Sequence, residues 1–366
     1  MTEAVQTHQI ALMSATGLIY RTVSSEKARD CTPDEIPIID VARLWGSLED
    51  RKELAREVLH ACENTGFFYI KNHGITNSSI TKVLDRSKEF FYQPEELRQK
   101  ASRRHAKHLG GYLGRADRAG GSPTGKINTK EVFVMKYDPK FDPTVEDFTK
   151  IPEEVNEGLH AEEFYWQATQ HIDGFQDALV GHWRSCLDLA RRLIKIFAIA
   201  LELPENYFEH LVTYPGADLG VGLYPGWPEG MVAKEAEMGL NAHTDVQCFT
   251  LLWQDNHGGL EVLNRESQWV RVKPMDDTLV VNIGDFLMRL TNNRFQSTIH
   301  QVVPHDSPED RMSVAFFFGF NFNEQCSVVP TCITPENPKR YEPVVCGDYV
   351  QQRLEAAESF KVPMKG

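Results

Sequence analysis

The sequence predicts a mainly β protein with flanking helices, built on a double-stranded β-helix, which is the jelly-roll or cupin-like fold. From residue 219 onwards, apolar residues recur with a period of two in short runs. Turn-forming pairs such as Pro225-Gly226 and Asn292-Asn293 separate these runs. A long helix-type pattern precedes them, and it favours a bracing helix packed on a sheet.

The β-rich half should contain short strands of similar length. The expected strands cover 219–224, 238–245, 248–254, 259–263, 268–273, 278–283, 297–303 and 311–322. Strands of this length, separated by regular turns, are typical of a double-sheet jelly roll.

The first half should supply the helices. Helix-type spacing covers residues 49–64, 77–91 and 170–203, and Pro204 ends the longest of these helices. Short strands are expected at 36–40 and 67–70. Residues 102–129 are rich in Arg, Gly, Ser and Lys, which predicts a long mobile loop and a candidate lid.

These patterns divide the chain into parts that we expect to act as one catalytic unit. The expected parts are a mobile arm at 1–33, an N-terminal α/β module with bracing helices at 34–205, a jelly-roll catalytic core at 206–330, and a C-terminal strand and helix tail at 331–366 that packs on the core.

Composition limits the kinds of partner. The chain has 366 residues and a net charge of -13, which argues against nucleic acid or an anionic membrane as a partner. The 7 cysteines include no Cys-x-x-Cys pair, so we expect free thiols in a reducing compartment and a cytoplasmic location. No signal peptide or membrane span is indicated, and no heptad pattern suggests self-association, so we expect a monomer.

The candidate metal ligands are His243, Asp245 and His300. Residues i and i+2 of a strand project from the same face, so His243 and Asp245 can chelate one ion. His300 lies in a second β-rich run. Two imidazoles and one carboxylate on one face of an octahedron leave positions open for dioxygen activation by iron(II).

A second His-x-Asp pattern occurs at His171-Ile172-Asp173, near the start of the long helix. In a helix, residues i and i+2 point about 200° apart, which makes a poor chelate. We therefore expect no metal at this second copy.

A candidate anion site follows the third ligand. Period two places Arg311, Ser313 and Phe317 on one face of their strand. A guanidinium inside a barrel is costly unless it meets an anion, and its planar fork matches a carboxylate. A dicarboxylate that bridges the metal and Arg311 would meet both requirements. Arg265-Glu266-Ser267 repeats the pattern, but at a predicted hairpin turn, where we expect solvent.

Taken together, several segments resemble the isopenicillin N synthase-like family of iron(II)/2-oxoglutarate oxygenases over roughly residues 36 to 355. The segments are Ile36–Asp40, Gly66–Ile75, Lys130–Phe133, Asn241–Asp245, Gly258–Leu260, Val281–Asp285, His300 and the pair Arg311 and Ser313. In the family, the Lys-Glu segment that Lys130-Glu131 matches lies beside the substrate pocket.

The resemblance implies a 2-oxoglutarate-dependent dioxygenase that uses Fe(II), 2-oxoglutarate as co-substrate, and dioxygen. It implies that Arg311 and Ser313 bind the distal carboxylate of 2-oxoglutarate, and that Tyr224 helps to bind the co-substrate near the metal. Family members often carry Asn two residues before that tyrosine, where this chain has Gly222.

The expected substrate is a small organic specialised metabolite, which would be hydroxylated, desaturated or rearranged. Position and aromatic character suggest Tyr112, Phe133, Phe249 and Phe317 as pocket residues. Two alternatives remain open at this point. One is an isopenicillin N synthase-type oxidase that uses dioxygen without 2-oxoglutarate, and the other is a catalytically silent jelly-roll binding module.

Overall fold

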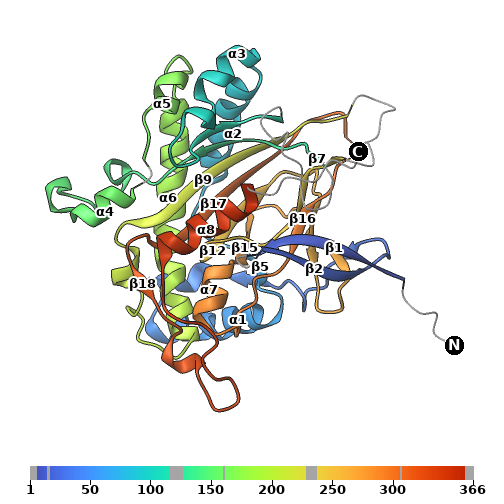
Figure 1. Cartoon of the computed structure of the whole chain (residues 1–366), viewed down its shortest axis with the longest axis vertical. Coiled ribbons are helices and arrows are strands. Elements are labelled where there is room, and N and C mark those ends of the chain that lie inside the picture. Colours follow the sequence, from blue (N-terminus) through green and yellow to red (C-terminus); the bar gives the residue numbers. More distant parts are fainter. Residues whose placement is uncertain are drawn as a thin grey trace.

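A large sheet forms the centre of the molecule. The computed structural model describes residues 6–14, 17–115, 127–159, 161–227, 237–305 and 307–358. The 8-stranded sheet has, in spatial order, β4 (Ile38–Asp40), β5 (Phe67–Lys71), β15 (Thr278–Ile283), β12 (Phe249–Gln254), β17 (Arg311–Asn321), β9 (Pro215–Tyr224), β8 (Glu131–Met135) and β6 (Gly111–Leu113). Its long central strands β9 and β17 run side by side across the molecule (Figure 1).

A second, 5-stranded sheet completes the jelly roll that the sequence predicts. Its order is β11 (Leu240–His243), β16 (His300–Val302), β13 (Leu260–Leu263), β14 (Trp269–Arg271) and β3 (Arg29–Asp30). A hydrophobic cluster joins the two sheets, with Phe67 and Val280 from the large sheet against Val262 and Val270 from the small one. The core between two inner faces is the mark of a double-sheet architecture.

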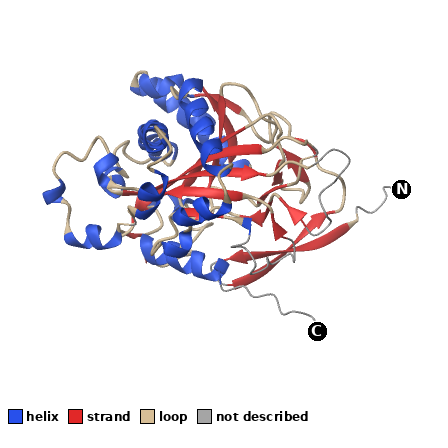
Figure 2. Ribbon diagram, turned by 90° about the horizontal axis from the view of Figure 1, so that it is seen from above, coloured by secondary structure: helices blue, strands red, loops and turns tan. Residues whose placement is uncertain are grey.

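The helices cover the outer face of the large sheet. They are α1 (Leu48–Asn64), α2 (Asn77–Phe91), α3 (Glu95–Arg98), α4 (Glu153–Gly158), α5 (Phe164–Thr169), α6 (Phe175–Ala200), α7 (Asp285–Leu290) and α8 (Cys346–Glu358). Figure 2 shows most of them gathered to one side of the strands. No helix of the described residues is long and apolar enough to cross a membrane.

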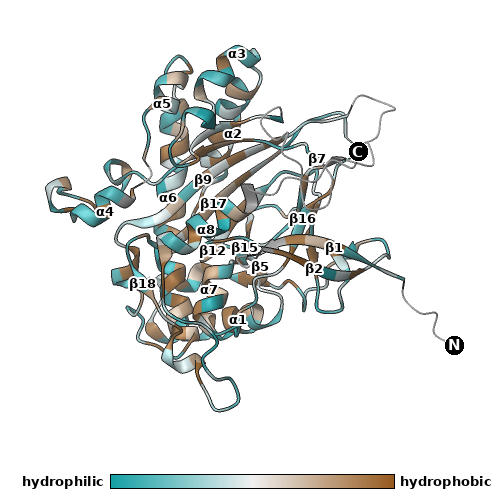
Figure 3. Cartoon of the chain, viewed as in Figure 1, coloured by the Kyte–Doolittle hydropathy of each residue, from teal (hydrophilic) through white to brown (hydrophobic). Residues whose placement is uncertain are grey.

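The packing of the bracing helix α6 shows which residues of β9 face outward and which face the jelly-roll interior. Its Trp183 donates from Nε1 to the carbonyl oxygen of Ala217 in β9, at 2.9 Å. Leu219 and Val221 pack in the same core, so Gly220, Gly222 and the other even-numbered residues of β9 face the jelly-roll interior. Brown apolar residues mix with teal polar ones along the labelled helices (Figure 3).

The long helix is shorter than the expected range of 170–203. It begins at Phe175, after Gly174, whose φ of 66° breaks the helical path, and it ends at Ala200. Residues 164–169 form the separate helix α5. The apolar spacing crosses the break because both sides of it pack on the same core.

The first residues are more regular than the expected arm at 1–33. β1 (Thr7–Ser14) and β2 (Gly17–Ser24) form an antiparallel hairpin, which projects to one side of the sheets (Figure 1). Val23 packs there with Leu263 and Trp269 of the small sheet. Because these contacts are distant in sequence, the local pattern alone could not reveal them.

The expected loop at 102–129 is also partly regular. Residues 116–126 of this stretch lie outside the described residues. Among the rest, β6 joins the edge of the large sheet. β7 (Ile127–Asn128) pairs in parallel with β10 (Glu237–Met238).

The last short sheet pairs β18 (Gln325–Cys326) with β19 (Val344–Val345).

Candidate active site

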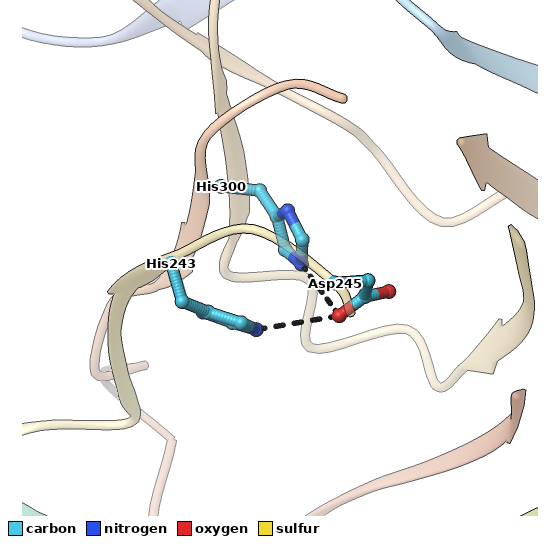
Figure 4. A group of neighbouring side chains, drawn as sticks. All are labelled: His243, Asp245 and His300. Atoms are coloured by element: carbon cyan, nitrogen blue, oxygen red, sulfur yellow. Dashed lines mark ion pairs between the residues drawn. The ribbon is translucent and has the colours of Figure 1, made fainter. Parts of the chain in front are cut away.

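His243, Asp245 and His300 come together at one end of the jelly roll. His243 ends β11 and lies directly across from His300 in β16. Asp245 follows two residues later. Its Oδ1 atom lies 3.7 Å from Nε2 of His243 and 3.7 Å from Nε2 of His300, so all three side chains point at one spot (Figure 4).

Backbone carbonyls fix both imidazole rings. Nδ1 of His243 lies 2.8 Å from the carbonyl oxygen of Asn241, and Nδ1 of His300 lies 3.0 Å from that of Thr298. Each Nδ1 therefore carries the proton and donates, which leaves the Nε2 lone pair free. Phe67 holds the His300 ring edge-on, with ring centroids 5.4 Å apart.

The carboxylate is held through its other oxygen. Oδ2 of Asp245 accepts hydrogen bonds from Thr250 Oγ1 at 2.5 Å and from Asn282 Nδ2 at 2.7 Å. Thr250 and Asn282 are direct partners across β12 and β15. Their bonds leave Oδ1 of Asp245 facing the histidines.

The electrostatics of the cluster favour a cation. Burial and the neighbouring His300 lower the pKa of His243 to about 4, so its ring is neutral at pH 7. Burial opposes ionisation of Asp245, but His300 and His243 hold the pKa of its carboxyl below the usual value. Two imidazoles and one carboxylate are the donors that iron(II) takes in the facial arrangement.

The donor spacing fits a single ion. Facial ligands with metal–ligand bonds of about 2.1 Å lie about 3 Å from each other. The ligand atoms of His243 and His300 lie 3.7 Å from Oδ1 of Asp245, so they need to close by less than about 1 Å around an ion. Within the described ranges, no other trio of His, Cys, Asp or Glu side chains gathers in this way. His171 of the second His-x-Asp copy instead contacts Gln93 through Nε2, at 2.8 Å.

A cationic pocket lies deeper in the jelly roll. Arg311 is 1% exposed. Its Nε donates to the carbonyl oxygen of Gly258, and its Nη2 donates to Gln254 Oε1 at 3.3 Å. Its buried Nη1 has no hydrogen-bond partner. An unpaired buried guanidinium nitrogen is costly, so this nitrogen is available to an anionic ligand.

Tyr224 and Ser313 complete this pocket. Arg311 lies opposite Tyr224, and Ser313 opposite Gly222, across β17 and β9. The Arg311 guanidinium carbon is 4.3 Å from the centre of the Tyr224 ring. Burial alone would raise the pKa of the Tyr224 phenol, but the charges of Lys130 and Arg311 hold it below its ordinary value. The pocket is therefore positive and rich in donors.

A cavity of about 600 Å³ opens beside the candidate metal ligands. Its lining includes His243, Asp245, Phe317, Lys136 and Asp218, together with residues of α8. Lys136 Nζ and Asp218 Oδ2 form a buried ion pair 2.7 Å long. A volume of this size suits a small molecule.

Of the four aromatic residues expected to line a pocket, Phe317 lines this cavity. Tyr112, Phe133 and Phe249 belong to the main hydrophobic core instead. The reason is the alternation of strand faces: Phe249 is one residue away from Thr250, which faces the site, so its ring points outward to Phe197 of α6.

The structure also shows polar residues that sequence reasoning missed as site residues. Thr250 and Asn282 hold Asp245, and Gln254 holds Arg311. Asp285, at the start of α7, accepts hydrogen bonds from Thr244 at 3.0 Å and from Arg353 at 2.7 Å. Strand parity could have placed Thr250 and Gln254 on one face, but it could not show that they lie opposite Asn282 and Ser313.

Family models match two parts of the chain. Residues 211–320 match the 2OG-Fe(II) oxygenase superfamily. Residues 36–156 match the N-terminal region of the non-haem dioxygenases described from morphine synthesis. The first match contains the three candidate metal ligands, Arg311 and Ser313.

Relatives match nearly the whole chain. The 2-oxoglutarate-Fe(II) type oxidoreductase ppzC of Metarhizium rileyi is 38% identical over 360 residues, which are 97% of this chain and 96% of that protein. The 2-oxoglutarate-Fe(II) type oxidoreductase hxnY of Emericella nidulans is 30% identical over 340 residues, covering 90% and 93% of the two chains.

Solved structures share the fold. Full-length T7H of Neurospora crassa, in complex with alpha-KG and thymine, superposes with a TM-score of 0.73 at 25% identity and covers 89% of this chain and 98% of its own. A 2OG-Fe(II) oxygenase family protein from Caulobacter crescentus has a TM-score of 0.73 at 26% identity, over 88% and 99% of the two chains.

Proposed function

The chain belongs to the 2OG-Fe(II) oxygenase superfamily, and from this premise we propose that it oxidises a small organic specialised metabolite in the cavity beside His243 and Asp245. It is an oxidoreductase that uses iron(II), 2-oxoglutarate and dioxygen. The proposal extends to the residues that hold each component and to the class of substrate.

We propose that His243, Asp245 and His300 hold the iron. The observation that carries this assignment is the convergence of their ligand atoms on one point, with Asp245 Oδ1 3.7 Å from both Nε2 atoms. When bound, iron with 2-oxoglutarate supplies the activation of dioxygen for attack on a C–H bond, while the co-substrate is converted to succinate and carbon dioxide. The carbonyls of Asn241 and Thr298 keep the histidines in the ligand tautomer.

The deeper pocket is assigned to the co-substrate. Arg311 and Ser313 bind its distal carboxylate, and Tyr224 packs on the Arg311 guanidinium. The free Nη1 of Arg311 supports this role, because a carboxylate would provide the acceptor that this buried nitrogen lacks. Burial of the pocket excludes water, which strengthens each of these contacts.

The substrate cavity combines an apolar wall with one ion pair. Phe317 lies in its lining, and Lys136 and Asp218 present a donor and an acceptor side by side. This pair suits a substrate with an adjacent donor and acceptor, and Lys107 and Arg353 add cationic side chains to the same lining. The thymine bound by Neurospora crassa T7H is a small ring of that kind.

An anaerobic spectrum tests the site assignment. Iron(II) and then 2-oxoglutarate are added to metal-free protein while the visible spectrum is recorded. We expect a charge-transfer band in the native protein, no band in His243→Ala and a weakened band in Arg311→Ala. Iron binding without a band would instead favour an oxidase that needs no 2-oxoglutarate, and absence of iron binding would favour a silent binding module.

The substrate is then sought by succinate release across a panel of small metabolites. A true substrate should raise succinate release above the uncoupled rate in native protein. The Phe317→Ala variant should lower this stimulation while leaving the charge-transfer band unchanged. An unchanged stimulation in Phe317→Ala would contradict the assignment of the cavity.

A further inference from the structure

The space beside Gly222 is already filled by another side chain. Gly222 faces the co-substrate pocket, opposite Ser313. A methyl group added at Gly222 would overlap Cε of Lys130, and it would lie 3.2 Å from Lys130 Nζ and 3.1 Å from Ser313 Oγ. The missing side chain at position 222 is therefore what admits Lys130 to the pocket.

The backbone holds Lys130 in this position. Thr129 N donates to the Met238 carbonyl oxygen at 2.8 Å, and Lys130 N donates to that of Gly239 at 3.3 Å. Asn128 Oδ1 accepts from the backbone N of Asn241 at 2.8 Å. The segment that carries Lys130 is thus hydrogen-bonded to the segment that leads to His243, while the Lys130 side chain lies beside Gly222 and the Tyr224 ring.

Among the described residues, no carboxylate forms an ion pair with Lys130. Its neighbour Glu131 accepts hydrogen bonds from Arg98 and from the Tyr112 hydroxyl, both at 2.6 Å, on the outer side of the strand. The Lys130 ammonium instead makes a cation–π contact with the Tyr224 ring, whose centre lies 5.5 Å from Nζ.

Lys130 and Arg311 therefore place two positive charges around one phenol. The Arg311 guanidinium carbon lies 4.3 Å from the centre of the same Tyr224 ring, and its Nη1 has no partner. Two cations, a serine hydroxyl and a phenol together form a site for a dianion, because like charges this close repel each other until an anion joins them.

We infer that Lys130 is a further co-substrate-binding residue, whose ammonium donates a charge-assisted hydrogen bond to a carboxylate of 2-oxoglutarate. Lys130 directly precedes β8, and its side chain supplies the polar contact that Gly222 of β9 cannot make. This inference rests on the proposed co-substrate site, and the experiment separates the two: the native spectrum tests the site, and the Lys130 variants test the lysine.

The test is an anaerobic titration of 2-oxoglutarate into iron(II)-loaded protein, followed by the charge-transfer band. Lys130→Met keeps the aliphatic stem and removes the charge. Loss of one charge-assisted hydrogen bond should raise the Kd for 2-oxoglutarate roughly ten- to hundredfold. Lys130→Arg should retain most of the affinity. Lys150→Met is the control, because the Lys150 side chain is 79% exposed, and its Kd should match that of native protein.

A steric variant gives an independent result. Gly222→Ala should weaken 2-oxoglutarate binding in native protein, because the new methyl group displaces Lys130. In a Lys130→Ala background the same change should have little further effect. An equal loss in both backgrounds, or 2-oxoglutarate binding as tight in Lys130→Met as in native protein, would overturn the role of Lys130.

Discussion

The chain contains the pattern His-x-Asp twice, and the two copies have different surroundings. His243 ends a strand opposite His300, and its Asp245 is held by Thr250 and Asn282. His171 lies in a turn before α6, where its Nε2 contacts Gln93. The same three-residue pattern is thus a proposed ligand pair in one place and an exposed turn in the other.

The pattern Arg-x-Ser is also duplicated. Arg311 is buried under Gln254 and Gly258, with one nitrogen free. Arg265 is exposed and donates to the backbone carbonyl oxygens of Asn64 and Glu63. In both comparisons, the strand partner across the sheet decides whether the short pattern forms part of a site.

The largest expected effect separates the two histidines. His243→Ala should lower iron affinity by on the order of a hundredfold or more, since even outer partners of metal ligands are worth roughly 10–100-fold. 2-Oxoglutarate turnover should fall with it. His171→Ala, the matched control, should leave both unchanged. Iron affinity is measured by anaerobic titration. Equal affinities in the two variants would show that the two copies do not differ in metal binding.

The next effect separates the two arginines. Arg311→Ala removes a buried charge-assisted contact and should raise the Kd for 2-oxoglutarate roughly ten- to hundredfold, with iron affinity little changed. Arg265→Ala should bind 2-oxoglutarate like native protein, because its partners are backbone oxygens at the surface. A similar loss in both variants would mean that general charge, rather than the pocket, attracts the co-substrate.

A smaller effect should come from the support of Asp245. Asn282→Ala removes the hydrogen bond to Asp245 Oδ2 and should lower iron affinity roughly 10-fold. Asn77→Ala is the control, because Asn77 donates to Asp277 at the surface, at 2.6 Å. If the iron affinities of the two variants agree, the orientation of Asp245 does not depend on Asn282.

A last effect, on stability rather than on ligand binding, concerns a scaffold histidine. Burial, with a smaller contribution from His73, lowers the pKa of His182 in α6 to about 4. The folded protein therefore disfavours the charged ring, and stability should fall as pH drops from about 6.5 towards 4.

As the pH falls from 7 to 5, His182 should lower the free energy of unfolding by about 2 kcal/mol. His182→Gln should remove that part of the pH dependence and leave iron and 2-oxoglutarate binding unchanged. Denaturant unfolding of metal-free native and variant protein at the two pH values measures the difference. Parallel losses of stability in both proteins would show that His182 does not contribute.

Much of the fold follows from local periodicity. The range 77–91 is helical as the spacing predicts, and the strand 278–283 has the predicted bounds. The hairpin of β1 and β2 was not predicted, because it is stabilised by Leu263 and Trp269, far along the chain. Gly174 adopts a left-handed backbone conformation that divides the predicted long helix, and the spacing of apolar residues does not predict it.

The candidate site was predictable where a short pattern and strand parity coincide, as at Arg311 and Ser313 in β17. Asp245 lies beyond His243, the last residue of β11, so strand parity does not place its side chain. Parity also places Phe317 on the face of Arg311 and Ser313. Position and aromatic character led to Tyr112 and Phe133, which pack in the core. The pairing of Thr250 with Asn282 and the entry of Lys130 beside Gly222 depend on which strands are neighbours.

The ion pair between Arg353 and Asp285 has a consequence for enzyme engineering. Arg353 belongs to α8, which forms part of the cavity wall, while Asp285 also bonds Thr244, the residue between two metal ligands. Replacing α8 with a helix from another enzyme, to change substrate preference, would therefore also disturb the loop that presents Asp245. A successful graft must carry an arginine at position 353 along with the new cavity residues.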